Sequence, residues 1–133
     1  MKTVLLVCVH NSGRSQMAEA FFNQMAEGKA LALSAGTEPA SAVNPTVVEA
    51  MREVGIDISA KRPKALRDYM LDAADLVVTM GCGAQAVCPA AFVETEDWEL
   101  EDPEGRPLEE VRQIREEIRA RVQELAGRFR ASN

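Results

Sequence analysis

The chain has 133 residues, 47% of them hydrophobic, and a formal net charge of −6. This length fits one domain, expected over residues 1–133, that buries a core without disulfides or metals. The acidic balance argues against nucleic acid as the main partner, and no apolar run approaches the roughly 20 residues of a membrane span. The apolar start of the chain lacks the small-residue cleavage site of a signal peptide, so we expect a cytoplasmic protein.

The first half of the chain alternates between predicted strands and helices. Residues 3–7 form a continuous apolar run, which is typical of a strand covered on both faces. After a turn, a helix is expected over 15–28, with Ser15 as its cap. A second strand at 30–35 and a helix over 45–54 follow, and a proline suits the first turn of that helix.

The second half begins with a weaker helical pattern at 64–73. Residues 75–80 are a clear buried strand, and 91–93 can form a short fourth strand. In the last helix apolar residues recur every three or four positions: Leu108, Val111, Ile114, Ile118, Val122, Leu125 and Phe129. Strands separated by helices of this size predict a single α/β domain, a four-stranded parallel sheet with helices on both faces.

The first strand ends in a motif with a cysteine, five residues, an arginine and a serine. The motif is Cys8-Val9-His10-Asn11-Ser12-Gly13-Arg14-Ser15. Because a helix follows, the main-chain N–H groups of residues 9–14 can surround a tetrahedral dianion, and Arg14 can bind two of its oxygens. The positive potential of these N–H groups and of the helix start also favours the thiolate form of Cys8, to which Ser15 can donate a hydrogen bond. The alternative is a buried Cys8 before an ordinary helix, but the strand–loop–helix setting favours an anion loop.

Further motifs accompany this loop in a fixed order along nearly the whole chain. They lie at residues 16–19, 34–36, 43–45, 55–59, 75–80 and 98–103. The ordered set resembles the arsenate reductase branch of the low-molecular-weight tyrosine phosphatase fold, and it is far more specific than any one motif. The resemblance implies reduction of arsenate to arsenite in arsenic detoxification, with no cofactor and no bound metal.

The resemblance also places the aspartate of an Asp-Pro pair over the anion loop, which makes Asp102 the expected general acid. Displacing oxygen from arsenic requires a proton donor for the leaving hydroxide. The alternative is that Asp102 is one more carboxylate in the acidic stretch 94–110, where Glu101 is its nearest competitor.

The remaining thiols are Cys82 and Cys88, and a total of three cysteines cannot form a complete disulfide framework. The resemblance implies that Cys8 attacks arsenate, Cys82 attacks Cys8, and Cys88 attacks Cys82 to carry the disulfide to a reductant. Alternatively, Cys82 and Cys88 are buried hydrophobes, or they bind zinc with His10. Their spacing does not match a usual zinc site, and His10 is expected to point outward from the loop.

Two features depart from the family pattern. Five residues separate Cys82 and Cys88 where thioredoxin-coupled relatives have six, so the reductant is either thioredoxin or a mycoredoxin- or glutaredoxin-like protein. Some relatives hold potassium beside the loop through positions that Asn11, Glu19 and Ser34 match. The further aspartate is missing from residues 61–64, where a lysine can take the place of the cation, so bound potassium is not expected.

Two other functions fit parts of this pattern. A tyrosine phosphatase would use Cys8, Arg14 and Asp102 on a phosphoester, but the aromatic residues that flank an aryl phosphate are scarce. A non-catalytic oxyanion-binding thiol sensor would use the cysteines alone and would need no general acid. For the enzyme we expect a monomer, with arsenate and the reductant as its partners.

Overall fold

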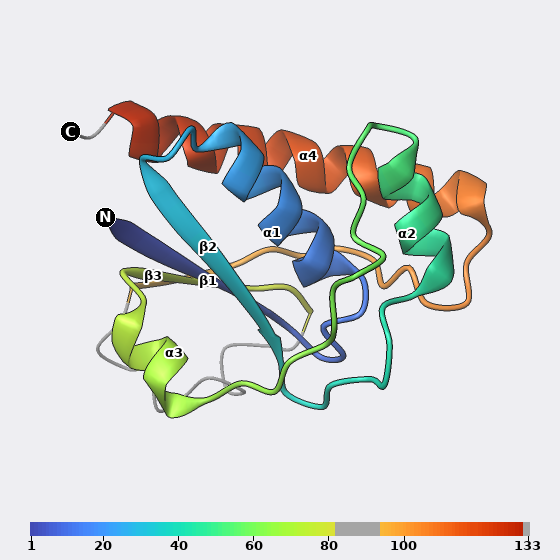
Figure 1. Cartoon of the computed structure of the whole chain (residues 1–133), viewed down its shortest axis with the longest axis horizontal. Helices are drawn as coiled ribbons and strands as arrows, with labels where there is room; N and C mark the ends of the chain where they lie inside the picture. Colours follow the sequence, from blue (N-terminus) through green and yellow to red (C-terminus); the bar gives the residue numbers. More distant parts are fainter. Residues whose placement is uncertain (82–93, 132–133) are drawn as a thin grey trace.

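The computed structural model describes residues 1–81 and 94–131, which contain four strands and four helices (Figure 1). In chain order these are β1 Lys2–Cys8, α1 Arg14–Met25, β2 Ala30–Gly36, α2 Pro45–Arg52, α3 Asp68–Ala73, β3 Leu76–Thr79, β4 Glu94–Asp97 and α4 Leu108–Ala131. None of the helices in these two ranges has both the length and the apolar character needed to cross a membrane.

The four strands form one parallel sheet in the order β2-β1-β3-β4. This arrangement confirms the predicted α/β fold. Since the strands are parallel, their carboxyl ends meet at one edge, where ligands bind in sheets of this kind. The residues at that edge are Cys8, Gly36, Thr79 and Asp97.

Helices cover both faces of the sheet, as predicted: α1, α2 and α4 lie on one side and α3 on the other (Figure 1). The central strand β1 contributes to both cores, because successive side chains of a strand point to opposite faces. Val4 and Leu6 pack in the larger core with α1 and α4, whereas Leu5 and Val7 pack in the smaller core that includes Leu71 of α3.

The starts of two helices differ from those predicted, and one predicted strand is not tested. Helix α1 begins at Arg14 with Gly13 as its N-cap and no capping side chain, so the prediction that Ser15 caps the helix was wrong. Helix α3 starts only at Asp68, because the preceding residues run alongside β2: Gly36 N donates to Lys64 O. The described fourth strand is β4, while the expected strand 91–93 lies outside the described residues.

Candidate active site

The loop between β1 and α1 turns its carbonyl groups outward. Each carbonyl oxygen of residues 8–13 accepts a hydrogen bond from a donor beyond the loop: Thr37 N, Glu38 N, Ala40 N, Gln16 Nε2, Asn44 N and Met17 N, in order of the acceptor. In a trans peptide the N–H group points opposite to the preceding carbonyl, so the N–H groups of residues 9–14 face the inside of the loop. Within residues 1–81 and 94–131 no side chain caps α1, which leaves its positive end available to an anion.

Asn11 gives the loop its tight curvature. It is fully buried and has a φ of 50°, in the left-handed region that asparagine adopts more readily than most residues. Its side-chain oxygen accepts hydrogen bonds from Lys64 N at 2.8 Å and from Gln16 Nε2 at 3.1 Å. Its Nδ2 donates to Ser15 Oγ at 2.7 Å. Asn11 is therefore held by segments on both sides of it.

Cys8 lies at the base of this loop and is only 2% exposed. Its Sγ accepts a hydrogen bond from Asn11 N at 3.3 Å and lies 2.8 Å from Ser15 Oγ. Because Ser15 Oγ already accepts a hydrogen bond from Asn11, its own hydrogen is available to the sulfur. The cysteine is thus buried, but its sulfur has polar partners rather than purely apolar surroundings.

Arg14 and Asp102 lie beside each other at the loop. Arg14 is 6% exposed; its Nη1 donates to Leu100 O at 3.2 Å, and its Nη2 is 3.7 Å from Asp102 Oδ2. Glu101, the competing carboxylate, instead pairs with Arg106 at 3.2 Å. Of the two carboxylates that the sequence offered, Asp102 is the one next to the Arg14 guanidinium.

Other expected site residues are placed as follows. His10 is part of the loop, but its side chain is 40% exposed: Nδ1 donates to Glu38 O at 3.0 Å, and Nε2 lies 3.7 Å from Glu104. Val9 and Ser12 take part through the main chain. Cys82 and Cys88 lie outside the described residues.

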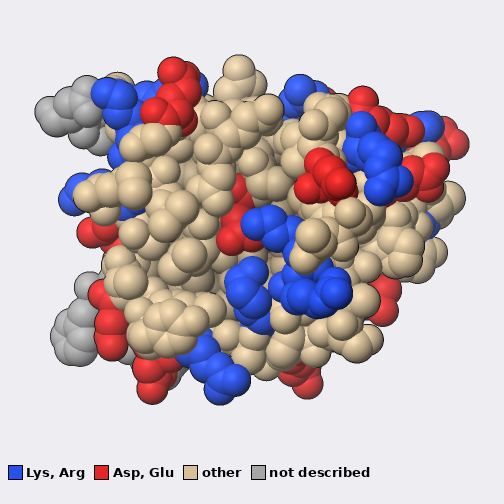
Figure 2. All heavy atoms as spheres, in the orientation of Figure 1, with Lys and Arg blue, Asp and Glu red and all other residues tan. Residues whose placement is uncertain are grey.

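A partly buried ion pair joins Glu19 to Lys64, whose main-chain N–H also donates to Asn11. Glu19 of α1 is 6% exposed and accepts a hydrogen bond from Ser34 Oγ at 3.0 Å. The ammonium group of Lys64 lies 3.4 Å from Ser34 Oγ and 3.9 Å from Glu19. The cation next to Glu19 and Ser34 is therefore a lysine of the chain itself. Figure 2 shows basic side chains gathered on this face of the molecule.

Sequence reasoning did not single out Gln16, which joins this network. Its Nε2 donates to Asn11 and to Arg62 O, and its Oε1 is a buried acceptor without a hydrogen-bond partner in the described part of the chain. The only signal for Gln16 was its place in the motif 16–19 that follows the loop.

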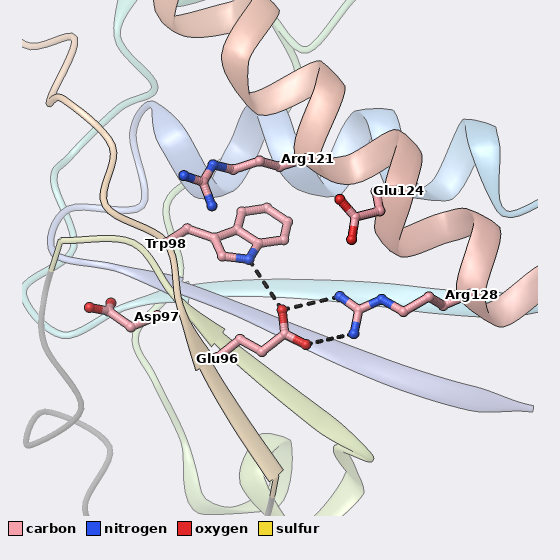
Figure 3. Close-up of a pocket in the computed structure, with 6 residues that line it drawn as sticks. All are labelled: Glu96, Asp97, Trp98, Arg121, Glu124 and Arg128. Atoms are coloured by element: carbon pink, nitrogen blue, oxygen red, sulfur yellow. Dashed lines mark hydrogen bonds and ion pairs between the residues drawn. The ribbon is translucent and has the colours of Figure 1, made fainter.

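A separate pocket of about 370 Å³ lies between β4 and α4 (Figure 3). Its charged groups largely satisfy one another: Arg128 donates two hydrogen bonds to Glu96, which lowers the pKa of that carboxyl, and Arg121 lies over the Trp98 ring. The lining residues are Glu96, Asp97, Trp98, Arg121, Glu124 and Arg128, none of which belongs to the anion loop. This pairing indicates a structural role.

The fold and the loop together define a phosphatase-like α/β protein, with a buried cysteine at the end of the first strand and a loop of inward-facing N–H groups that opens the first helix. The chain belongs to the low molecular weight phosphotyrosine protein phosphatase family, whose sequence profile matches residues 3–133.

Within this family the chain is similar to arsenate reductases. It is 40% identical over 132 residues to a glutaredoxin arsenate reductase of Synechocystis sp., covering 97% of this chain and 99% of the relative. An arsenate reductase solved in the phosphate-binding state superposes with a TM-score of 0.88 at 37% identity, over 97% of this chain and 99% of that one. A thioredoxin-dependent arsenate reductase of Corynebacterium glutamicum gives 0.81 at 39% identity, over 100% of this chain and 63% of that one.

Proposed function

We propose that this protein reduces arsenate to arsenite and so serves arsenic detoxification. The observation that carries the proposal is the sulfur of Cys8, which is hydrogen-bonded at the base of a loop whose amides face inward and beside which Arg14 lies. Such a loop is complementary to a tetrahedral dianion. The similarity to arsenate reductases over nearly the full length of both chains selects arsenate among such dianions.

In the first step the Cys8 thiolate attacks arsenic, and a sulfur–arsenic bond forms as an arsenic–oxygen bond breaks. Asp102 gives its proton to the departing hydroxide, which leaves as water. Arg14 and the main-chain N–H groups of residues 9–14 stabilise the charge on the remaining oxygens. Ser15 donates its hydrogen bond to the sulfur and so holds the thiolate in place.

The second and third steps are thiol exchanges. Cys82 attacks Cys8, the new sulfur–sulfur bond replaces the sulfur–arsenic bond, and the electron pair of that bond stays on arsenic, which leaves as arsenite. Cys88 then attacks Cys82 and frees Cys8, so the disulfide moves to Cys82–Cys88. Two thiols are oxidised for each arsenic reduced.

A protein of the thioredoxin type is the reductant that we propose, and a glutaredoxin- or mycoredoxin-like protein is the alternative. Relatives of both kinds exist, because one is named a glutaredoxin and one a thioredoxin-dependent arsenate reductase. A third cysteine that receives the disulfide suits direct reduction by thioredoxin. A thiol relay of this kind requires a reducing compartment, which supports the expected cytoplasmic location.

The test is arsenate turnover with thioredoxin, thioredoxin reductase and NADPH. We expect no activity for Cys8→Ser or Cys82→Ser and strong impairment for Cys88→Ser. Normal turnover by Cys82→Ser with every reductant would contradict the relay. Full activity of Cys88→Ser with a mycothiol–mycoredoxin system would assign the alternative reductant.

The same experiment separates the other two functions. A tyrosine phosphatase would hydrolyse aryl phosphate and leave arsenate unchanged. The structure offers no aryl-binding wall from Trp98, which is 5% exposed, or from Tyr69, which lies on α3 across the sheet from α1. A sensor would bind arsenate without turnover, and the position of Asp102 beside Arg14 favours an enzyme.

A further inference from the structure

The segment that carries Asp102 connects β4 to α4 and packs directly on the anion loop. A Cβ atom on Gly13 would lie 2.7 Å from Pro103 Cγ, so the loop and the segment touch at this point. The carboxylate of Asp102 is oriented locally: Oδ1 accepts a hydrogen bond from Glu104 N at 3.0 Å, and Oδ2 is the oxygen nearer to Arg14. The hydrogen bond from Glu104 N and the proximity of Arg14 are thus two interactions that orient the Asp102 carboxylate.

Arg106 provides a third interaction that holds Asp102 in place. Its Nε donates to the main-chain oxygen of Asp102 at 3.1 Å, and its Nη1 lies 3.2 Å from carboxylate oxygens of both Glu101 and Glu110. Its own N–H donates to Pro103 O across a turn in which Gly105 has a φ of 74°. The planar guanidinium of Arg106 thus contacts Glu101 and Asp102 of the segment and Glu110 in the first turn of α4, and so joins the segment to the helix.

Arg106 also forms an ion pair with Glu101, the residue that immediately precedes Asp102. Without its partner, a second unpaired carboxylate would stand beside Asp102 and compete with it as the proton donor. Arg106 engages this carboxylate and holds it on the α4 side of the segment.

We propose that Arg106 is a positioning residue that selects Asp102, and not Glu101, as the proton donor. By binding the Asp102 carbonyl and the Glu101 carboxylate together, it keeps Asp102 Oδ2 towards the anion loop. Arg106 acts through Asp102, since its hydrogen bonds and ion pairs in the described part of the chain are with residues 101–103 and 110 and not with the loop itself. This inference rests on the proposed role of Asp102.

The test compares Arg106→Gln, Arg106→Lys and Asp102→Asn in full-length protein, with kcat/KM for arsenate measured against pH. General acids contribute roughly 10²–10⁴-fold, and a small displacement forfeits part of that. We expect Arg106→Gln to lower kcat/KM about tenfold and to change the alkaline side of the pH profile, with partial rescue by Arg106→Lys. The inhibition constant of inorganic phosphate should stay unchanged, because the loop is intact.

The matched control is Arg112→Gln, which removes an arginine of α4 that pairs with Glu53 instead. It should lose stability without any change in the pH profile. Thermal unfolding of all variants shows whether a loss of rate is a loss of folded protein, and the lysine variant serves if the glutamine variant does not fold.

The double variant Arg106→Gln/Asp102→Asn decides how Arg106 acts. If it acts through Asp102, the double variant is no slower than Asp102→Asn alone, because residues that act as a unit are not additive. If Arg106→Gln lowers kcat/KM by the same factor in Asp102→Asn as in the wild type, the inference is overturned. Full activity of Asp102→Asn would instead show that Asp102 is not the general acid, and this result differs from one in which only the role of Arg106 fails.

Discussion

Two residues of the site hold backbone conformations that most residues avoid. Asn11 has a φ of 50°, and the hydrogen bonds of its side chain compensate for this conformation. Gly81, after β3, has a φ of 84°, and a Cβ atom there would collide with the guanidinium of Arg14. The position of the Arg14 guanidinium therefore depends on the absence of a side chain at a residue far from it in sequence.

This dependence predicts the effect of Gly81→Ala. We expect the phosphate inhibition constant and the KM for arsenate to rise at least about tenfold, because the new methyl group displaces the guanidinium that we propose binds two oxygens of the anion. The control is Gly55→Ala, where φ is 83° but no atom lies within 4 Å of the added Cβ. Both variants pay roughly 1–2 kcal/mol of backbone strain, measured by urea unfolding. Equal anion affinity in the two would contradict the steric argument.

At the scale of elements, the carboxylate of Glu53 forms ion pairs that join α2 to α4. Glu53, the C-cap of α2, binds Arg112 and Arg115 of α4, and Arg115 also donates to Ala50 O. The start of the same helix supports the loop, since Asn44 N donates to Ser12 O. The position of α2 thus links the last helix of the chain to the anion loop.

The ion pair makes stability depend on pH. The hydrogen bond from Arg112 lowers the pKa of Glu53 from 4.5 to about 2. A lowered native pKa stabilises the fold above the unfolded value, and this contribution is lost as pH falls from about 4.5 to about 2. We expect Glu53→Gln to be less stable than the wild type in urea at pH 7 and to approach it at pH 2. The control is the exposed Glu117→Gln, which should stay within about 0.5 kcal/mol of the wild type at pH 7.

At the scale of the whole molecule, the anion loop joins the central strand to a helix of the larger core. A ligand that binds only this assembled loop must stabilise the entire fold. Inorganic phosphate at 100 times its dissociation constant should therefore raise the free energy of unfolding by about 2.7 kcal/mol. Chloride at the same ionic strength and the variant Arg14→Ala are the controls. Equal stabilisation of Arg14→Ala by phosphate would show that the anion binds elsewhere.

Much of the fold was predictable because each element carries a local signal. The apolar runs of β1 and β3 and the three-to-four-residue periodicity of α4 reflect burial that is continuous along the chain. The late start of α3 was not predictable, because the residues before it are held by hydrogen bonds to Gly36 of β2. The expectation that Ser15 caps the helix was wrong, because the curvature of the loop directs its hydroxyl to Cys8 and Asn11; the hydrogen bond to the Cys8 sulfur was predicted.

The sequence by itself determined the α/β architecture, the position of the anion loop and the identity of its sulfur, since strand, loop and helix are contiguous. The family resemblance named Asp102 and a lysine of residues 61–64, but only the tertiary structure placed Asp102 rather than Glu101 next to Arg14 and showed that the lysine beside Glu19 is Lys64. These contacts join segments that are distant in the chain. Their distances are set by how the connection between β4 and α4, and the segment after α2, pack on the carboxyl edge of the sheet, and no local pattern encodes that packing.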